Sequence, residues 1–190
     1  AGTATERAGG NNMSSSAGNG IYNYGAGPAD TAEDRAVGFL SSSSATKSGN
    51  VYVQLTNTGS STINSFTISY NVEKYRTGTN PAGFSIQMYY SADGITWTNA
   101  GSSFLTSFPT DATTEGYASA PGETVPVSAT LSYSLSAGSS LYLAWNYSVT
   151  TGTYTSYSQG LGIDDVSITA EGTASPTIVV NGTLSPFSTY

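Results

Sequence analysis

The sequence predicts an all-β fold, an antiparallel β-sandwich of jelly-roll type, and three observations lead to this prediction. Apolar and polar residues alternate with a period of two in several stretches. Clusters of Gly, Asn, Asp, Ser and Pro separate these stretches, as turns between strands do. No stretch repeats its apolar residues with the period of a helix. Many short strands separated by turns are typical of sandwiches.

The size of the chain agrees with one sandwich. It has 190 residues, of which 37% are hydrophobic, and this is enough for a single buried core. The longest apolar runs span only a few residues, so no membrane-spanning helix is expected.

The N-terminal part is the hardest to assign. The first 30 residues are rich in Gly, Asn, Ser and Ala, which suits either a linker or an irregular first strand with long loops. Residues 30–40 begin like a helical turn, but Val37 and Phe39 favour a short strand.

The alternation is clear from Asn50 onwards. Asp93 and Gly94 indicate a hairpin turn, because both residue types accept positive φ angles. Residues 99–122 read as loop. The strands that we expect from this point are 51–56, 66–73, 84–90, 95–98, 124–127, 131–135, 141–149 and 161–170.

We therefore predict three parts. Residues 1–19 form an irregular N-terminal segment, residues 20–171 form the sandwich module, and residues 172–190 are a linker and the first strand of a following domain. The alternative for the last part is a C-terminal strand of the same sandwich. No signal peptide is visible, so we expect a mature or excised segment of a longer chain.

Composition narrows the class of protein. Charged residues make up only 9% of the chain and the net charge is −7, which argues against nucleic-acid binding. The absence of Cys and His removes disulfides, zinc thiolates and the usual nucleophile and base pairs, so we expect no enzyme. Such a hydroxyl-rich, weakly charged surface is typical of extracellular or cell-surface proteins.

Two adjacent carboxylates, Asp164 and Asp165, lie inside an expected strand and must point to opposite faces. One of them needs a partner, because a buried, unpaired carboxylate is costly. A structural Ca²⁺ ion is one candidate, since it prefers oxygen ligands, and further ligands would be Asp30, Glu33 and Asp34. The alternative is an ion pair with Arg35 or Arg76.

Aromatic residues are the remaining functional candidates. Fourteen Tyr, six Phe and two Trp exceed what one core needs, and aromatic faces stack on sugar rings. We expect Trp97 and Trp145 in the core. The expected ligand-binding residues are Tyr89, Tyr142, Tyr147, Tyr154 and Tyr157, with Arg76 at the rim of the same site.

Several phrases of the sequence resemble a module that recurs in large secreted proteins of Bacteroidota. They are EDRAVGFL (33–40), ISYNVEKYR (68–76), YYSADGITWTNAG (89–101), LYLAWNYSV (141–149) and LGIDDVSITA (161–170). The resemblance covers about residues 20–171 and none of the phrases is a catalytic motif. Residues 173–190 resemble the start of a further sandwich repeat. Many such proteins leave the cell through a type IX secretion system, although this chain contains no sorting domain.

The phrase IDDVSI (163–168) also resembles the last strand of MAM-type and carbohydrate-binding jelly rolls. In those folds an Asp of this strand often helps to hold a structural calcium, so the resemblance implies Asp164 or Asp165 as a ligand.

The expected function is a non-catalytic extracellular module of a multidomain protein that binds a polysaccharide or a cell-surface polymer. The alternative is a structural repeat or subunit of an adhesin or extracellular filament, whose partners are neighbouring copies of itself. Strand addition by residues 177–180 would suit that alternative.

Overall fold

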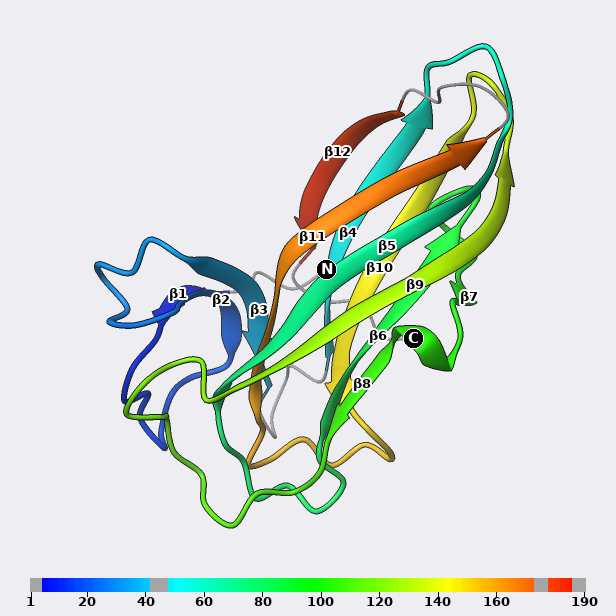
Figure 1. Ribbon diagram of the computed structural model, residues 1–190. Helices are drawn as coiled ribbons and strands as arrows, with labels where there is room; N and C mark the ends of the chain where they lie inside the picture. Colours follow the sequence, from blue (N-terminus) through cyan, green and yellow to red (C-terminus); the bar gives the residue numbers. More distant parts are fainter. Residues whose placement is uncertain (1–4, 42–47, 173–177, 186–190) are drawn as a thin grey trace.

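The computed structural model describes residues 5–41, 48–172 and 178–185. Two six-stranded sheets pack face to face, which confirms the expected all-β sandwich (Figure 1). The described residues otherwise contain a single turn of 3-10 helix, η1 (Ser102–Phe104). No helix among them is long and apolar enough to cross a membrane.

The first sheet has the strand order β1-β2-β3-β11-β5-β9. Its strands are β1 (Glu6–Gly9), β2 (Gly20–Gly25), β3 (Arg35–Leu40), β11 (Gly160–Gly172), β5 (Ile63–Arg76) and β9 (Glu123–Leu135). All neighbours in this sheet pair antiparallel except β1 and β2, which are parallel. The long β5 and β11 form its centre, so they position the loops at both of their ends.

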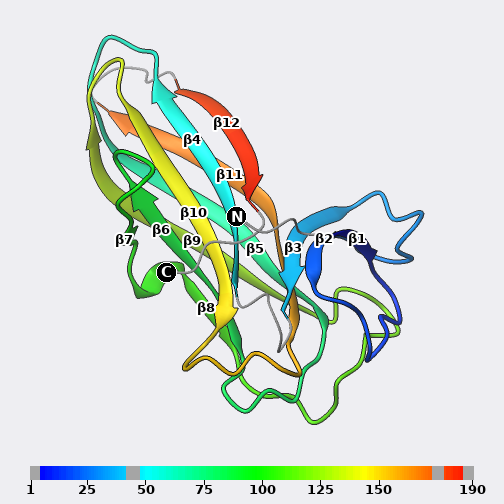
Figure 2. The same ribbon diagram turned by 180° about the vertical axis from the view of Figure 1, so that it is seen from behind.

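The second sheet has the order β12-β4-β10-β6-β7, and β8 also pairs with β6. Its strands are β12 (Ile178–Ser185), β4 (Ser48–Asn57), β10 (Ser140–Val149), β6 (Phe84–Ser91), β7 (Thr98–Asn99) and β8 (Leu105–Phe108). This sheet faces the viewer in Figure 2.

The core lies between the sheets and follows the period of two. On β10 the buried residues Leu141, Leu143, Trp145 and Tyr147 point inward. Phe66, Ile68, Tyr70 and Val72 face them from β5. The alternating pattern in the sequence therefore identifies the inner faces of both sheets.

A smaller cluster joins the N-terminal strands to the sandwich. The rings of Tyr22, Tyr24 and Tyr75 stack in series, with centroids 4.9 Å and 4.4 Å apart. Tyr24 and Tyr75 are fully buried. Stacked aromatic pairs contribute about 0.5–1.5 kcal/mol each beyond their area. This stack fixes β2 beside the end of β5.

The chain ends differ from the expected division into parts. Residues 6–9 of the segment expected to be irregular form β1. Residues 178–185 pair antiparallel with β4, from Ile178 opposite Asn57 to Ser185 opposite Asn50. This pairing agrees with the alternative of a C-terminal strand of the same sandwich, while residues 173–177 and 186–190 lie outside the described ranges.

Two strand boundaries also differ. The expected strands 124–127 and 131–135 are one continuous strand, β9, because Ser128, Ala129 and Thr130 all pair with β5. The expected strand at 95–98 is mostly turn, and only residues 98–99 pair with β6. In that turn the Asp93 carboxylate accepts hydrogen bonds from the N–H groups of Ile95 and Thr96.

Candidate functional site

The tyrosine loop, which we define as residues 150–159, joins β10 to β11 and presents two of the expected ligand-binding residues. Tyr154 is 53% exposed and Tyr157 is 58% exposed. A polar loop with exposed aromatic rings agrees with the position that the sequence suggested for them. The loop lies at the lower end of the molecule in Figure 1, beside the β5–β6 and β8–β9 loops.

Asn80 of the β5–β6 loop holds the backbone of the tyrosine loop. Its side chain is fully buried, and Nδ2 donates to the carbonyl oxygens of Tyr154 and Ser156, both at 2.8 Å. Its Oδ1 accepts from the N–H of Ala82 at 3.0 Å. Its backbone N–H donates to the Tyr157 carbonyl at 3.2 Å. One asparagine thus fixes three successive parts of the loop.

Gln159 holds the C-terminal end of the tyrosine loop. It is fully buried, and its Nε2 donates to the Pro109 carbonyl at 2.7 Å and to Asp111 Oδ2 at 2.6 Å. Its Oε1 accepts from the N–H of Phe84 at 3.0 Å. Asp111 in turn pairs with buried Lys74, whose Nζ lies 3.0 Å from Asp111 Oδ1. The loop is therefore tied to three different elements.

The backbone of Tyr157 has a φ of 53°. Residues other than Gly, Asn and Asp rarely adopt this region, and it persists only when the surroundings fix it. The Gly78 backbone lies so close to the Tyr157 carbonyl that a Cβ at position 78 would lie 2.3 Å from its oxygen. The exposed rings are thus carried on a backbone that is already ordered before any ligand arrives.

Arg76 does not line a ligand rim, contrary to expectation. It is 4% exposed, and its guanidinium donates to the carbonyl oxygens of Ser14, Ser15 and Ser158 at 2.6–3.1 Å. Burial lowers its pKa. Because these carbonyls satisfy the guanidinium, Arg76 connects the β1–β2 loop to the tyrosine loop inside the protein.

Tyr147 was expected to be exposed, and this was wrong. Its side chain is fully buried, its ring stacks on Phe84, and its hydroxyl donates to the Gln159 carbonyl at 2.8 Å. The same hydroxyl accepts from the N–H of Ser41 at 3.1 Å. Burial raises its pKa. Tyr147 is a core residue on the inner face of β10.

Tyr89 and Tyr142 are half-buried on the outer face of the second sheet. Tyr52 and Trp97 share this face, with ring centroids 5.4 Å apart, and a small cavity of about 140 Å³ lies between Tyr89, Trp97, Ala144 and Asn50. Trp97 was expected in the core, and the sequence did not single out Tyr52. Tyr142 precedes Val149, the end of β10, by seven residues, roughly 23 Å of strand. The structure therefore separates these two tyrosines from the tyrosine loop.

The two adjacent carboxylates lie at an irregularity of β11. The register with β5 shifts between Asp164 and Ser167, and Asp165 has a φ of 51°. The Asp165 N–H donates to Asp164 Oδ1 at 2.7 Å, and Asn71 Nδ2 donates to Asp165 Oδ2 at 2.9 Å. Within the described residues neither Asp forms an ion pair with Arg35 or Arg76, so that alternative is wrong.

Other carboxyls surround Asp164. Burial, a hydrogen bond with Asp34 and the negative charges of Glu73 and Asp165 raise the pKa of Asp164 to about 6. Burial also raises the pKa of Glu73, which accepts a hydrogen bond from the Tyr75 hydroxyl at 2.5 Å.

Of the further calcium ligands that the sequence suggested, Asp34 is thus the one that the structure brings to Asp164 and Asp165. The described residues contain no group of three or more acidic, His or Cys side chains arranged to hold a metal, so Asp30 and Glu33 do not complete one. A structural calcium at this position stays a prediction.

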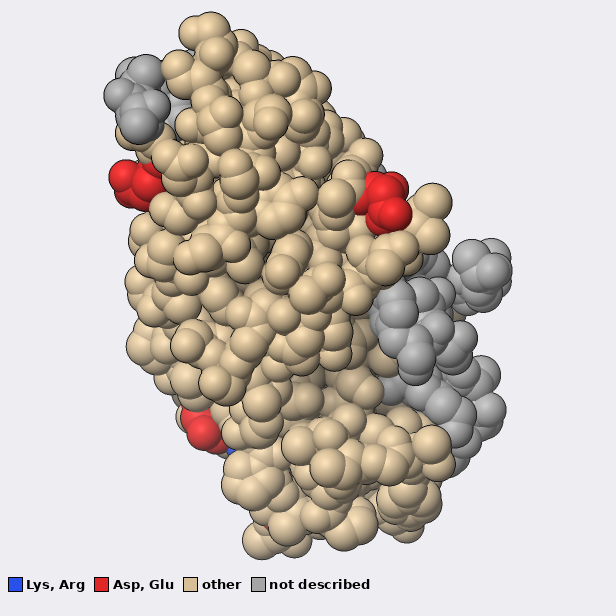
Figure 3. Space-filling view, turned by 90° about the vertical axis from the view of Figure 1, so that its right-hand side faces the viewer, with Lys and Arg blue, Asp and Glu red and all other residues tan. Residues whose placement is uncertain are grey.

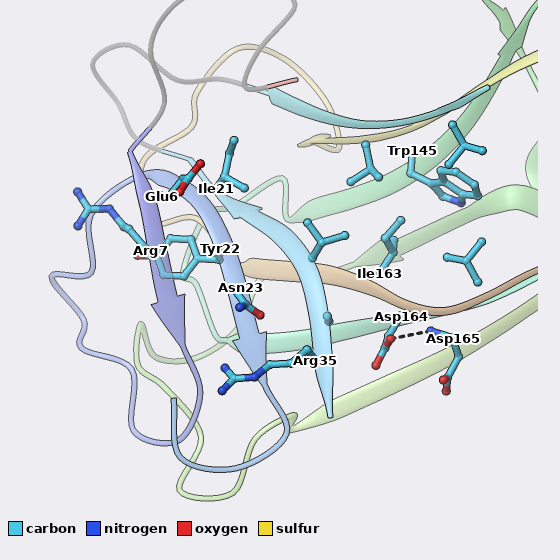
Figure 4. Close-up of a pocket in the computed structure, with 15 residues that line it drawn as sticks. Glu6, Arg7, Ile21, Tyr22, Asn23, Arg35, Trp145, Ile163, Asp164 and Asp165 are labelled. Carbon is cyan, nitrogen blue, oxygen red and sulfur yellow. Dashed lines mark hydrogen bonds between the residues drawn. The ribbon is translucent and has the colours of Figure 1, made fainter. Parts of the chain in front are cut away.

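A groove of about 720 Å³ opens beside this irregularity, between the two sheets (Figure 4). Ile21, Ile163 and Trp145 point into it, whereas Arg7 and Arg35 extend away from it and Asp164 and Asp165 lie on the other side of β11. Its apolar walls are completed by Val37, Val51, Val53 and Val166. The groove is therefore mostly apolar, although Glu6, Arg7, Arg35 and the two Asp residues are among those that line it.

The chain matches no protein-family model, and a comparison with curated proteins finds no relative.

Proposed function

We propose that this protein is a non-catalytic, extracellular module of a larger secreted or surface protein, and that it binds glycan through the tyrosine loop. The observation that supports this most is the pair of half-exposed rings, Tyr154 and Tyr157, on a backbone held by buried Asn80 and Gln159. We include in the proposal a jelly-roll type of sandwich, an origin in Bacteroidota and export of the parent chain through a type IX system.

Preorganisation favours binding at this loop. A loop that must become ordered on binding loses affinity, at about 0.5–1.5 kcal/mol for each immobilised side chain, whereas a loop that is already fixed does not. Tyrosine adds a rigid ring and a hydroxyl, which suit the apolar face and the polar rim of a sugar. Nearby Thr79 and Thr114, whose hydroxyls lie 3.1 Å apart, add further hydrogen-bonding groups.

The way in which the nearby ionisable groups are used supports a binding role rather than catalysis. Asp111 accepts hydrogen bonds from Lys74, Gln159 and the Gly78 N–H, so its oxygens hold the loops together. Lys74 is buried and paired with Asp111 and Glu123. General acid–base chemistry needs a group that can exchange a proton with a substrate, and these groups are already engaged.

The test is affinity electrophoresis of the folded protein in gels that contain polysaccharide. We expect retardation in at least one gel, and we expect Tyr154→Ala and Tyr157→Ala each to reduce it. Ile95→Ala is the matched control, because Ile95 is 81% exposed on the β6–β7 turn, away from the tyrosine loop. Equal mobility of the wild-type protein with and without every polysaccharide would contradict the proposal.

Assembly with further copies of this chain is the second candidate function, and the exposed apolar residues of strand β12 favour it. Val179 and Val180 are 46% and 52% exposed on an edge strand of the second sheet, and Val166 of β11 is 42% exposed. Consecutive apolar residues suit a strand that is covered on both faces, and uncovered edges invite strand addition. Sedimentation at high protein concentration separates the candidates: a strict monomer would count against assembly.

A further inference from the structure

We infer that the glycan bound by the tyrosine loop is an uncharged polysaccharide, and that uronic or sulfated glycans are excluded. This inference rests on the proposed function and names the ligand class of the same site. It follows from the position of each described cationic side chain and from the charges that lie around the loop.

Lys74, the lysine among the described residues, is not available to an anionic ligand. It is 3% exposed, and its Nζ lies 3.0 Å from Asp111 Oδ1 and 2.7 Å from Glu123 Oε2. Its ammonium also lies 4.9 Å from the centroid of the Phe108 ring. Two carboxylates therefore already neutralise Lys74.

Arg76 is equally unavailable, and the other two described arginines lie on the N-terminal strands. The guanidinium of Arg76 is buried against three backbone carbonyls of the β1–β2 and tyrosine loops. Arg7 and Arg35 belong to β1 and β3, where they donate to the carbonyls of Asn19 and Ala29. Lys47, the remaining basic residue, lies outside the described ranges.

The charges beside the loop are negative. Asp111 contacts Gly78, whose backbone packs on the Tyr157 carbonyl, and the Glu115 backbone pairs with Thr77 next to it. Among the described residues, the face in Figure 3 shows almost no Lys or Arg atoms between uncharged side chains, and acidic atoms at a few places. A polysaccharide with a carboxylate or sulfate on each sugar would bring like charges together, each close pair in water weakening binding about fivefold.

The net charge of −7 acts in the same direction over longer distances. Recognition of carboxylate or sulfate groups normally uses arginine or lysine donors with good geometry. The groups that the structure does offer here are tyrosine rings and the hydroxyls of Thr79 and Thr114, which suit neutral sugar hydroxyls.

The experiment compares two sets of polysaccharides in the same affinity gels. The neutral set is xylan, hydroxyethylcellulose and glucomannan, and the anionic set is alginate and polygalacturonate. Each gel is run at about 20 mM NaCl, where charges on protein and polymer interact, and at about 500 mM NaCl, where salt screens them strongly. We expect at least one neutral polymer to retard the protein, and the retardation at the two salt concentrations should differ by less than twofold. We expect no retardation by the anionic polymers at low salt.

The outcomes separate the two claims. Retardation by an anionic polymer at low salt, lost in Tyr154→Ala, would overturn the inference and leave glycan binding in place. Retardation by no polymer would overturn both. Glu115→Gln is the charge control, because Glu115 is exposed and its replacement keeps the acceptor for Thr113 Oγ1. We expect it to leave neutral-polymer affinity unchanged within twofold, and a larger change would contradict the role assigned to the uncharged groups.

Discussion

Replacement of Asn80 by Ala should loosen the tyrosine loop without removing either tyrosine. The change deletes two hydrogen bonds to the carbonyls of Tyr154 and Ser156 and one from the Ala82 N–H, all at 2.8–3.0 Å, around a fully buried side chain. Each such bond contributes about 1 kcal/mol net, and a buried group left unpaired costs up to about 3 kcal/mol. We expect a loss of roughly 3 kcal/mol in the free energy of unfolding.

For a chain of this size that loss corresponds to a Tm lower by about 6–12 °C, which differential scanning calorimetry measures. Glycan affinity at a temperature where the variant is folded should fall roughly tenfold, because two ring-bearing residues must then be ordered on binding. Asn80→Asp is the sharper variant, since a carboxylate oxygen would replace the donor that faces two carbonyl oxygens. It should be at least as destabilising as Asn80→Ala. A Tm within 2 °C of wild type for both variants would refute the role of Asn80.

Four further predictions concern the fold. Because its folded pKa is raised to about 6, Asp164 favours folding below pH 4 and loses that contribution as the pH rises to about 6, so Asp164→Asn should flatten the dependence of Tm on pH between 4 and 6. Asp93→Asn should instead lower the Tm above about pH 4 and matter little near pH 2, since hydrogen bonds from the N–H groups of Thr96 and Ile95 lower the pKa of Asp93 to about 2 and the contribution of its carboxylate is lost as the pH falls; a difference in Tm that grows as the pH falls would show that this sign is wrong. If calcium binds at Asp164 and Asp165, a chelator should lower the Tm by several degrees and Asp165→Ala should abolish that response. A melting curve that the chelator leaves unchanged would contradict the calcium proposal. Gly38→Ala should prevent β3 from pairing with β11, since its Cβ would lie 2.0 Å from the Leu161 carbonyl oxygen, while Gly182→Ala meets nothing closer than 3.9 Å and should leave the urea midpoint almost unchanged.

Periodicity was a reliable guide wherever a strand has one buried and one solvated face. The alternation in β5, β6 and β10 predicted their inner faces, and the same pattern places Tyr147 inward together with Leu141 and Leu143. Tyr147 was nevertheless among the expected ligand-binding residues, because the aromatic residues exceed what one core needs. The register of β10 was therefore the better evidence, and it was already present in the sequence.

The ends of the chain carried no such signal. Strand β1 has four residues in a Gly-rich stretch, and it forms because β2 offers a parallel partner. Strand β12 follows a linker-like segment, and only its pairing with β4 shows where it lies. Both strands are defined by a partner that is distant in the sequence or separated by a long loop.

The hydrogen bonds that hold the candidate site in place could not be predicted from the sequence either. Asn80 reaches carbonyl oxygens 74 and 76 residues away, and Arg76 bonds carbonyls 61, 62 and 82 residues away. Every residue type has a backbone carbonyl, so no pattern of side chains reveals such acceptors. The exposure of Tyr154 and Tyr157 was predictable from the polar loop around them, but the rigidity of that loop was not.

The most direct test of glycan binding by the tyrosine loop is an NMR titration with soluble, neutral xylo- and cello-oligosaccharides that follows the aromatic protons of each tyrosine. The account predicts that the ring signals of Tyr154 and Tyr157 shift progressively and saturate, while the signals of buried Tyr24 and Tyr147 do not move. Saturable shifts confined to other residues, or no shifts at millimolar oligosaccharide with the protein folded, would contradict it.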